Sequence, residues 1–182
     1  MKKIGTGKME YDSGRYNYDL GIYEFYPARR ILCVGYDKFF VPFPWTYFVV
    51  GRQKEVCGFF LMIGFLPEKF QPEKSKKPEF NMLPISGSTY FVCLGSGFNN
   101  YEYYWDLDFD VVAKTMINAY FASDFVKNEV FIPIHQKERL ISNFRQWSQF
   151  KNFKEMNIDW EHSDKLLIDD ESTRWHDFEW SE

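Results

Sequence analysis

Apolar, β-branched and aromatic residues gather in four short runs in the N-terminal part of the chain. These runs are residues 20–26, 30–36, 45–51 and 56–65. Turn-forming residues separate them, among them Pro27, Pro42 and Pro44. Runs of this length and composition are typical of β-strands, and connections this short favour antiparallel neighbours. We therefore expect an antiparallel β-meander of about four strands.

Helical periodicity is found only in the C-terminal part of the chain. Apolar residues recur at helical spacing from about Asp108 to Ser123, with Asp106 or Asp108 in position to cap the first turn. A second helix is expected to begin near Pro133 or Ile134, because proline suits a first helical turn. Strands followed by two or more helices predict an α+β fold.

The end of the chain differs from the rest in its charge. Between Glu155 and Glu182 ten acidic and two basic residues give a net charge of −8, whereas the whole chain carries −4. The same stretch contains three tryptophans: Trp160, Trp175 and Trp180. We divide the chain into a single α+β domain, residues 1–156, and an acidic tail, residues 157–182. Leaving indoles in water is unfavourable, so we expect some of them to pack on the body or on a partner.

Composition narrows the function classes. Aromatic residues reach 21%, with 20 Phe, 12 Tyr and 6 Trp, which predicts an aromatic, sheet-based core. The absence of a dense Lys/Arg stripe argues against a nucleic-acid partner. The first residues lack the apolar stretch of a secretory signal, and no apolar run is long enough to span a membrane. Three cysteines without framework spacing indicate reduced thiols, so we expect a cytoplasmic protein.

Neither a metal nor a cofactor is expected. The three histidines, His135, His162 and His176, are far apart in sequence, and no Cys or His pair has ligand spacing. The glycines around Ser96 lack the lysine of a phosphate-binding loop, which favours a flexible turn.

Cys93 is the candidate nucleophile. It follows an apolar, β-prone run and precedes a loop rich in glycine and asparagine, a place where a thiol reaches solvent. An exposed thiolate is a nucleophile. Cys33 and Cys57 lie inside strand-like runs and are expected to be buried. The alternative is that Cys93 is itself a small apolar core residue.

Several short motifs surround Cys93 in a particular order. They are the strand-like and proline-containing segment 59–70, Leu83-Pro84-Ile85, Val92-Cys93-Leu94, Trp105, and the helical segment 111–117. In this order they resemble the third strand and following loop, the His-Pro-Asn motif, the catalytic cysteine, and the later tryptophan and helix of ubiquitin-conjugating (UBC-like) enzymes. The resemblance spans residues 45–122 and is closest to divergent prokaryotic or phage-type members.

The resemblance implies that Cys93 carries a ubiquitin-like modifier as a thioester, with that modifier or its activating enzyme as the partner. In the family, the asparagine of His-Pro-Asn stabilises the oxyanion formed during transfer to an amine. Ile85 stands in its place here and has no side-chain donor. Asn81, Asn99 and Asn100 are the nearest substitutes, and the last two lie on the loop beyond the thiol.

The alternative function is a non-enzymatic structural or interaction protein, including one of viral origin. It would use an aromatic-rich α+β scaffold and the acidic tail to dock on a protein partner, with Trp160, Trp175 and Trp180 as the partner-binding residues. Ile85 favours this alternative, because an asparagine there would favour ligation. The sequence leaves the oligomeric state open.

Overall fold

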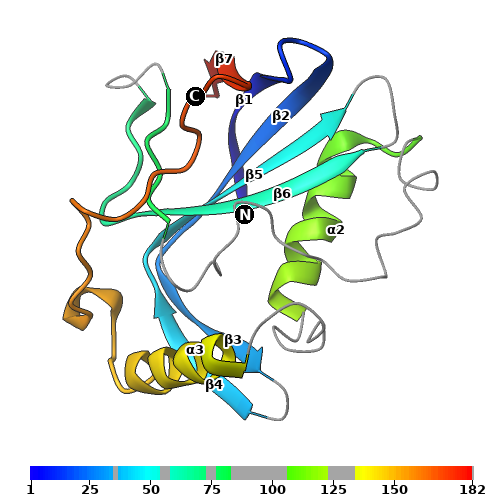
Figure 1. Ribbon diagram of the computed structural model, residues 1–182. Helices are drawn as coiled ribbons and strands as arrows, with labels where there is room; N and C mark the ends of the chain where they lie inside the picture. Colours follow the sequence, from blue (N-terminus) through cyan, green and yellow to red (C-terminus); the bar gives the residue numbers. More distant parts are fainter. Residues whose placement is uncertain (35–36, 54–57, 73–76, 83–105, 123–133, 182) are drawn as a thin grey trace.

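The computed structural model describes residues 1–34, 37–53, 58–72, 77–82, 106–122 and 134–181 (Figure 1). In this part of the chain the strands are β1 (Lys2–Tyr11), β2 (Tyr16–Phe25), β3 (Ala28–Val34), β4 (Asp37–Phe43), β5 (Trp45–Gln53), β6 (Phe59–Leu66) and β7 (Thr173–Trp180). The helices are α2 (Phe109–Ala122), α3 (Ile134–Trp147) and the short 3-10 helix η4 (Phe153–Glu155).

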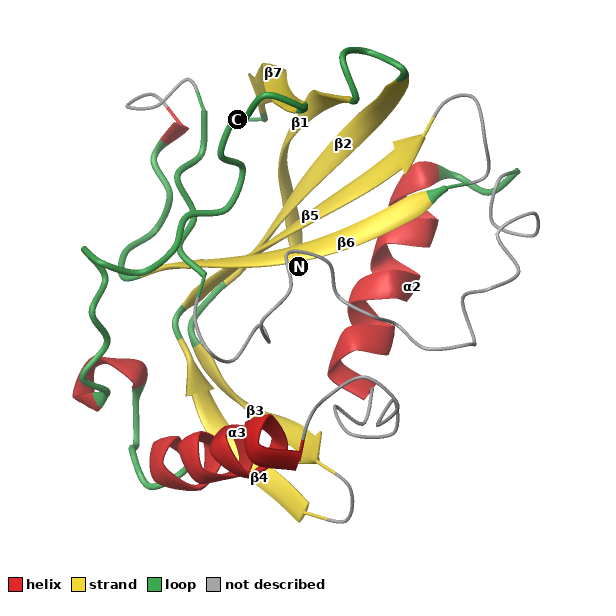
Figure 2. Cartoon of the chain, viewed as in Figure 1, coloured by secondary structure: helices red, strands yellow, loops and turns green. Residues whose placement is uncertain are grey.

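Five strands form an antiparallel sheet in the order β6-β5-β2-β1-β7, and β3 pairs with β4 in a smaller sheet. The register of β2 on β5 continues unchanged into β3 on β4, so these four strands together form one long hairpin. In that register Pro27 stands opposite Pro44. Neither residue has an N–H to donate, so the ladder is interrupted there, and beyond it the hairpin leaves the main sheet (Figure 2).

The prediction of a UBC-like α+β fold is wrong. The described residues form seven strands in two sheets and only two α-helices, which makes the fold mostly β. The four expected runs coincide with β2, β3, β5 and β6, but β1, β4 and β7 were not predicted. Their sequences gave weak local signals. With β1 and β7 included, the main sheet has five strands, and their order differs from that of a simple four-stranded meander.

Glycines and rings on two distant strands explain why β1 and β7 were missed. A side chain at Gly5 would meet the Trp180 ring at 2.6 Å, and one at Gly7 would meet the Phe178 ring at 2.8 Å. The glycines of β1 therefore leave room for the aromatic side chains of β7 that cover them. The glycines of β1 weaken its strand signal, and their role becomes clear only where β1 pairs with β7.

The helices agree closely with their predicted positions. The Asp108 carboxylate accepts hydrogen bonds from the backbone N–H groups of Asp110 (2.9 Å) and Val111 (3.3 Å), which confirms Asp108 as the helix cap. Helix α2 lies against the main sheet and α3 against the β3–β4 hairpin (Figure 2). Neither they nor any other described helix has the length and hydropathy that membrane crossing requires.

Both faces of the main sheet are covered. One face packs under α2 and continues to the hairpin, through residues that include Phe48, Leu61, Met116 and Phe144. The other face packs under the loops after β6 and before β7, through Met9, Tyr47, Phe60, Phe80, Leu166 and others. Aromatic side chains are abundant in both clusters, as the composition predicted.

All three tail tryptophans contact the body, which confirms that part of the prediction. Trp175 lies in β7 and is 7% exposed. The Trp180 ring lies 4.6 Å from Phe70 between centroids, and Trp160 packs at the edge of the cluster under α2. The stretch separated from the body on its charge thus supplies an integral strand of the main sheet.

Candidate binding groove beside strand β7

An open groove of about 740 Å³ crosses one face of the main sheet and ends at the loop before β7. We call it the aromatic groove. Its apolar lining consists of Met9, Tyr11, Tyr18, Phe59, Phe60, Met62, Leu167, Ile168 and Trp175. Its polar lining consists of Asp170, Ser172 and Thr173, all from the loop before β7 or its first residue.

The floor of the groove depends on a glycine in β5. A Cβ atom at Gly51 would overlap the Phe60 ring, so the ring occupies the space above this glycine. From there Phe60 contacts Tyr18 edge-on at 5.2 Å and Trp175 at 6.4 Å between ring centroids. Edge-to-face pairs at these distances are favourable. Three strands that are not all neighbours therefore contribute to one continuous aromatic surface.

The loop 168–173 forms a fixed rim. Asp170 accepts hydrogen bonds from the backbone N–H groups of Ser172 (2.8 Å) and Thr173 (2.7 Å) and from the Ser172 hydroxyl. These bonds lower the pKa of Asp170 below its ordinary value, and the bond from the Ser172 N–H has the largest effect. The Trp175 indole Nε1 donates to the carbonyl of Ile168 at 3.2 Å. The carboxylate of Asp170 is thus ionised at neutral pH and held at the groove.

Asp169 ties the same rim to the rest of the molecule. It accepts the backbone N–H of Trp175 at 2.9 Å and pairs with the Lys77 ammonium at 2.8 Å. Partial burial favours its neutral form, but the hydrogen bonds of Lys77 and Trp175 outweigh burial and lower the pKa of Asp169. Leu167, just before it, has a left-handed φ of 60°, which is unfavourable for a non-glycine residue. This turn buries Leu167 and exposes Ile168.

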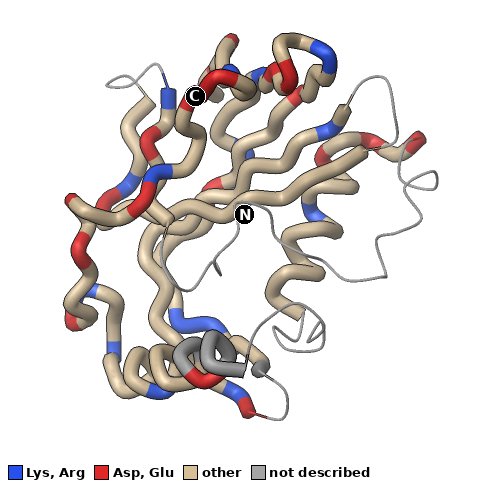
Figure 3. The backbone as a smooth tube through the Cα atoms, viewed as in Figure 1, with Lys and Arg blue, Asp and Glu red and all other residues tan. Residues whose placement is uncertain are grey.

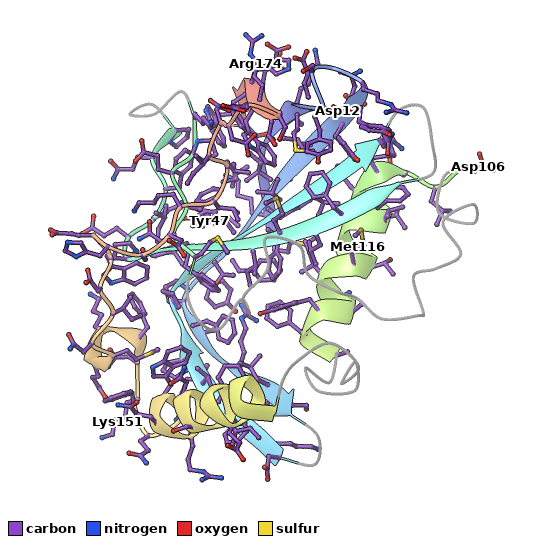
Figure 4. All side chains as sticks on the ribbon, in the orientation of Figure 1. Asp12, Tyr47, Asp106, Met116, Lys151 and Arg174 are labelled. Atoms are coloured by element: carbon purple, nitrogen blue, oxygen red, sulfur yellow. The ribbon has the colours of Figure 1, made fainter. Side chains whose placement is uncertain are left out.

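Two apolar side chains are exposed at the mouth of the groove. Ile168 is 55% exposed and Tyr11 is 44% exposed. The backbone N–H of Asp12 donates to the carbonyl of Ser172 at 2.8 Å, which fastens the β1–β2 turn to the rim. Figure 4 shows Asp12 and Arg174 together at this end of the molecule. Apolar surface beside fixed polar groups is typical of a binding site.

Acidic side chains recur along the segment that leads to the groove. Figure 3 marks the positions of acidic residues between the 3-10 helix η4 and β7, with few basic residues among them. This stretch belongs to the region of net charge −8. The mouth of the groove therefore lies in a negative part of the surface.

The predicted catalytic residues lie outside the described residues: Cys93, Asn99 and Asn100. The third substitute donor, Asn81, is 3% exposed and donates to the carbonyl of Trp160 at 3.1 Å, a structural contact. Cys33 carries a free, partly buried thiol. Within the described residues no three His, Cys, Asp or Glu side chains gather as a metal site requires.

Of the predicted partner-binding residues, the structure places Trp175 in the groove but not Trp160 or Trp180. Sequence reasoning missed Tyr18, Phe60 and Ile168. A glycine within a strand pattern signals the close approach of another group. Gly51 was therefore an available signal for the floor of the aromatic groove. Ile168 had no such signal, because it lies in a loop whose conformation depends on Asp169 and Asp170.

Comparison with protein-family models, with curated proteins and with solved structures finds no match for this chain.

Proposed function

We propose that this chain is a non-enzymatic binding protein that docks an apolar segment of a partner protein in the aromatic groove. The observation that carries the proposal is the groove itself: about 740 Å³ of open, aromatic-lined space beside a rigid acidic rim. Ligand sites typically measure roughly 300–1,000 Å³ and combine an apolar lining with a few fixed polar groups. Aromatic residues and methionine are also enriched where proteins bind one another.

The form of the groove favours side-chain docking over strand addition. An added strand needs unpaired backbone groups at the edge of the sheet. The backbone N–H of Trp175, in β7, is already paired with Asp169, and that of Thr173 with Asp170. A partner would instead place apolar side chains on the floor around Phe60.

The charge at the mouth favours a partner segment with basic residues beside its apolar ones. Asp170 is ionised and has its hydrogen bonds within the loop, so it retains its full negative charge. A Lys or Arg placed there would gain complementary charge, which mainly raises specificity and association rate. The occupant we propose is therefore an apolar protein segment flanked by Lys or Arg.

Peptide selection with a matched control tests this proposal. Peptides displayed on phage are selected on the wild-type protein and counter-selected on Ile168→Glu. We expect enriched peptides with neighbouring apolar residues and at least one adjacent Lys or Arg, with affinities about tenfold weaker for Ile168→Glu. Ile31→Glu is the control, because Ile31 is equally exposed at 54% but lies on β3.

Methyl NMR locates the bound peptide. The Met9 and Met62 methyl signals should shift on peptide addition, because both side chains line the groove. The Met116 signal should not, because this residue of α2 is buried in the cluster on the other face of the sheet. Selection without enrichment would contradict the proposal, as would peptides that bind Ile168→Glu as tightly as wild type. A small apolar compound that fills the groove while no peptide does would identify a ligand-binding protein instead.

The thioester on Cys93 stays a prediction. Native-state alkylation with iodoacetamide tests it, with the partly buried Cys33 as an internal reference. A cytoplasmic setting belongs to the proposal for either function, since a free thiol at Cys33 suits a reducing compartment.

A further inference from the structure

A second pocket, of about 370 Å³, lies between the β3–β4 hairpin and the segment after α3. Its floor is apolar and is formed by Pro27, Pro42, Phe43 and Phe153. Pro42 and Phe43 are buried, whereas Phe153 and Pro27 are half-buried. Three exposed basic residues line its rim: Arg29, Lys151 and Lys154. We call it the basic pocket.

Arg29 is held in place before any ligand arrives. Its Nη2 donates to the carbonyls of Phe40 (2.8 Å) and Ser148 (2.9 Å), and its guanidinium lies 4.4 Å from the centroid of the Phe40 ring. A guanidinium has five N–H donors, and these two bonds use one nitrogen only. The remaining donors stay available at the rim. Because the side chain is already ordered, a ligand that binds it loses less side-chain entropy.

The three rim cations form no ion pair with any carboxylate of the described residues. The neighbouring carboxylate, Glu155, is used within its own turn: Oε2 accepts the backbone N–H of Lys151 at 3.0 Å, and Oε1 accepts the Asn152 side-chain amide at 2.6 Å. The salt bridges of the described residues lie elsewhere, on β1, β2, the loop after β6 and the segment from Asp159 onward. Among the described residues, three cations beside the one carboxylate of Glu155 leave this rim with a net positive charge.

We propose that the basic pocket docks an acidic segment of a partner protein, with one apolar or aromatic side chain of that segment on the floor. Charge complementarity indicates the occupant. The three cations lie on two chain segments, so a small molecule with one carboxylate would contact only some of them. A peptide with several Asp or Glu residues around one ring could contact all three. The floor has room for such a ring, at the lower end of the volumes typical of ligand sites. This inference is independent of the aromatic groove.

Fluorescence anisotropy with defined peptides tests the inference. The probe is a fluorescein-labelled peptide, Ser-Asp-Glu-Phe-Glu-Asp-Ser, and its reference is the uncharged analogue in which Asn and Gln replace Asp and Glu. We expect the acidic peptide to bind at least tenfold more tightly than the analogue, with affinity falling as salt rises. The double variant Lys151→Glu/Lys154→Glu should lose at least tenfold, and Phe153→Ser several-fold.

Matched variants separate this site from general charge and from the groove. Lys114→Glu reverses an exposed lysine on α2 and should leave binding unchanged, as should Ile168→Glu in the aromatic groove. Thermal melts confirm that each variant is folded. Equal affinity for the uncharged analogue would overturn the proposal, as would equal losses in Lys114→Glu and the double variant. Phenylacetate that binds as tightly as the peptide would also overturn it, in favour of a small-molecule site.

Discussion

The aromatic groove and the basic pocket lie at opposite ends of the molecule and differ in how they are built. Figure 4 shows Arg174 at the groove end and Lys151 at the other, beside α3. Both sites have an apolar floor, but the rim of the groove is acidic and that of the pocket is basic. The groove rests on the main sheet, whereas the pocket exists because the long hairpin leaves that sheet at Pro27 and Pro44.

This difference shows how one chain separates two kinds of surface. The net charge of −4 hides a tail of −8 and a remainder of +4. At the β1 end the tail carboxylates Asp177 and Asp169 pair with Lys8 and Lys77, whereas the three cations of the basic pocket pair with no carboxylate of the described residues. If both proposals hold, the protein joins a basic apolar segment at one end to an acidic one at the other.

The largest effect is expected from Phe144→Ala. Phe144 is fully buried between α3 and the hairpin, with its ring 6.0 Å from that of Phe39 between centroids. Truncating a buried phenylalanine costs about 3–5 kcal/mol, which urea unfolding would measure. Because Ser148, just after α3, helps to hold Arg29, the acidic peptide should also bind more weakly.

The groove should survive the same change. Peptides that dock there should still shift the Met9 and Met62 methyl signals in Phe144→Ala. Loss of those shifts in a folded variant would show that the two ends are coupled, and the comparison would then fail.

A smaller loss is expected from Gly51→Ala, at the other end. The added methyl group would overlap the Phe60 ring, which must move off the floor of the groove. Overpacking of this kind costs roughly 1–3 kcal/mol, and groove peptides should bind more weakly while acidic peptides are unaffected. Combining Gly51→Ala with Phe60→Leu should recover part of the stability, because the two residues share one space. Additive losses would exclude this explanation of the floor.

How much of this could be predicted from sequence depends on whether the signal was local. The runs that became β2, β3, β5 and β6 were visible, as was the cap at Asp108, because each depends on neighbouring residues. Strands β1 and β7 were not, because the glycines of one make sense only beneath the rings of the other. A partner more than 160 residues away leaves no local pattern.

The candidate sites follow the same rule. Trp175 was singled out for its chemistry and does line the groove, but its neighbours Tyr18 and Phe60 come from distant strands. Arg29 and Lys151 are also far apart in sequence, and they meet only because α3 and η4 pack beside the hairpin. Individual residues could therefore be chosen from sequence, but not the surfaces that they form together.

The smallest effect is expected from acid, and it should distinguish the two ends. The pKa of Asp169 lies below its ordinary value of 3.8, so its contribution to stability is present above that pH and is lost as pH falls through the lowered pKa. Protonation would weaken its bonds to Lys77 and Trp175, which hold the groove rim. The bonds of Arg29 to two carbonyls do not titrate in this range.

NMR signals followed from neutral pH down to pH 3 or so would test this difference. The indole N–H of Trp175 should respond in wild type as pH falls through the lowered pKa of Asp169, whereas signals around Arg29 should stay constant. Asp169→Asn keeps an acceptor for the Trp175 N–H but removes the charge, so the acid response of the rim should shrink. The control Asp37→Asn, an exposed carboxylate on β4, should leave that response unchanged. An equal response at both ends would mean that acid loosens the fold as a whole, because a local loss at Asp169 cannot reach the hairpin.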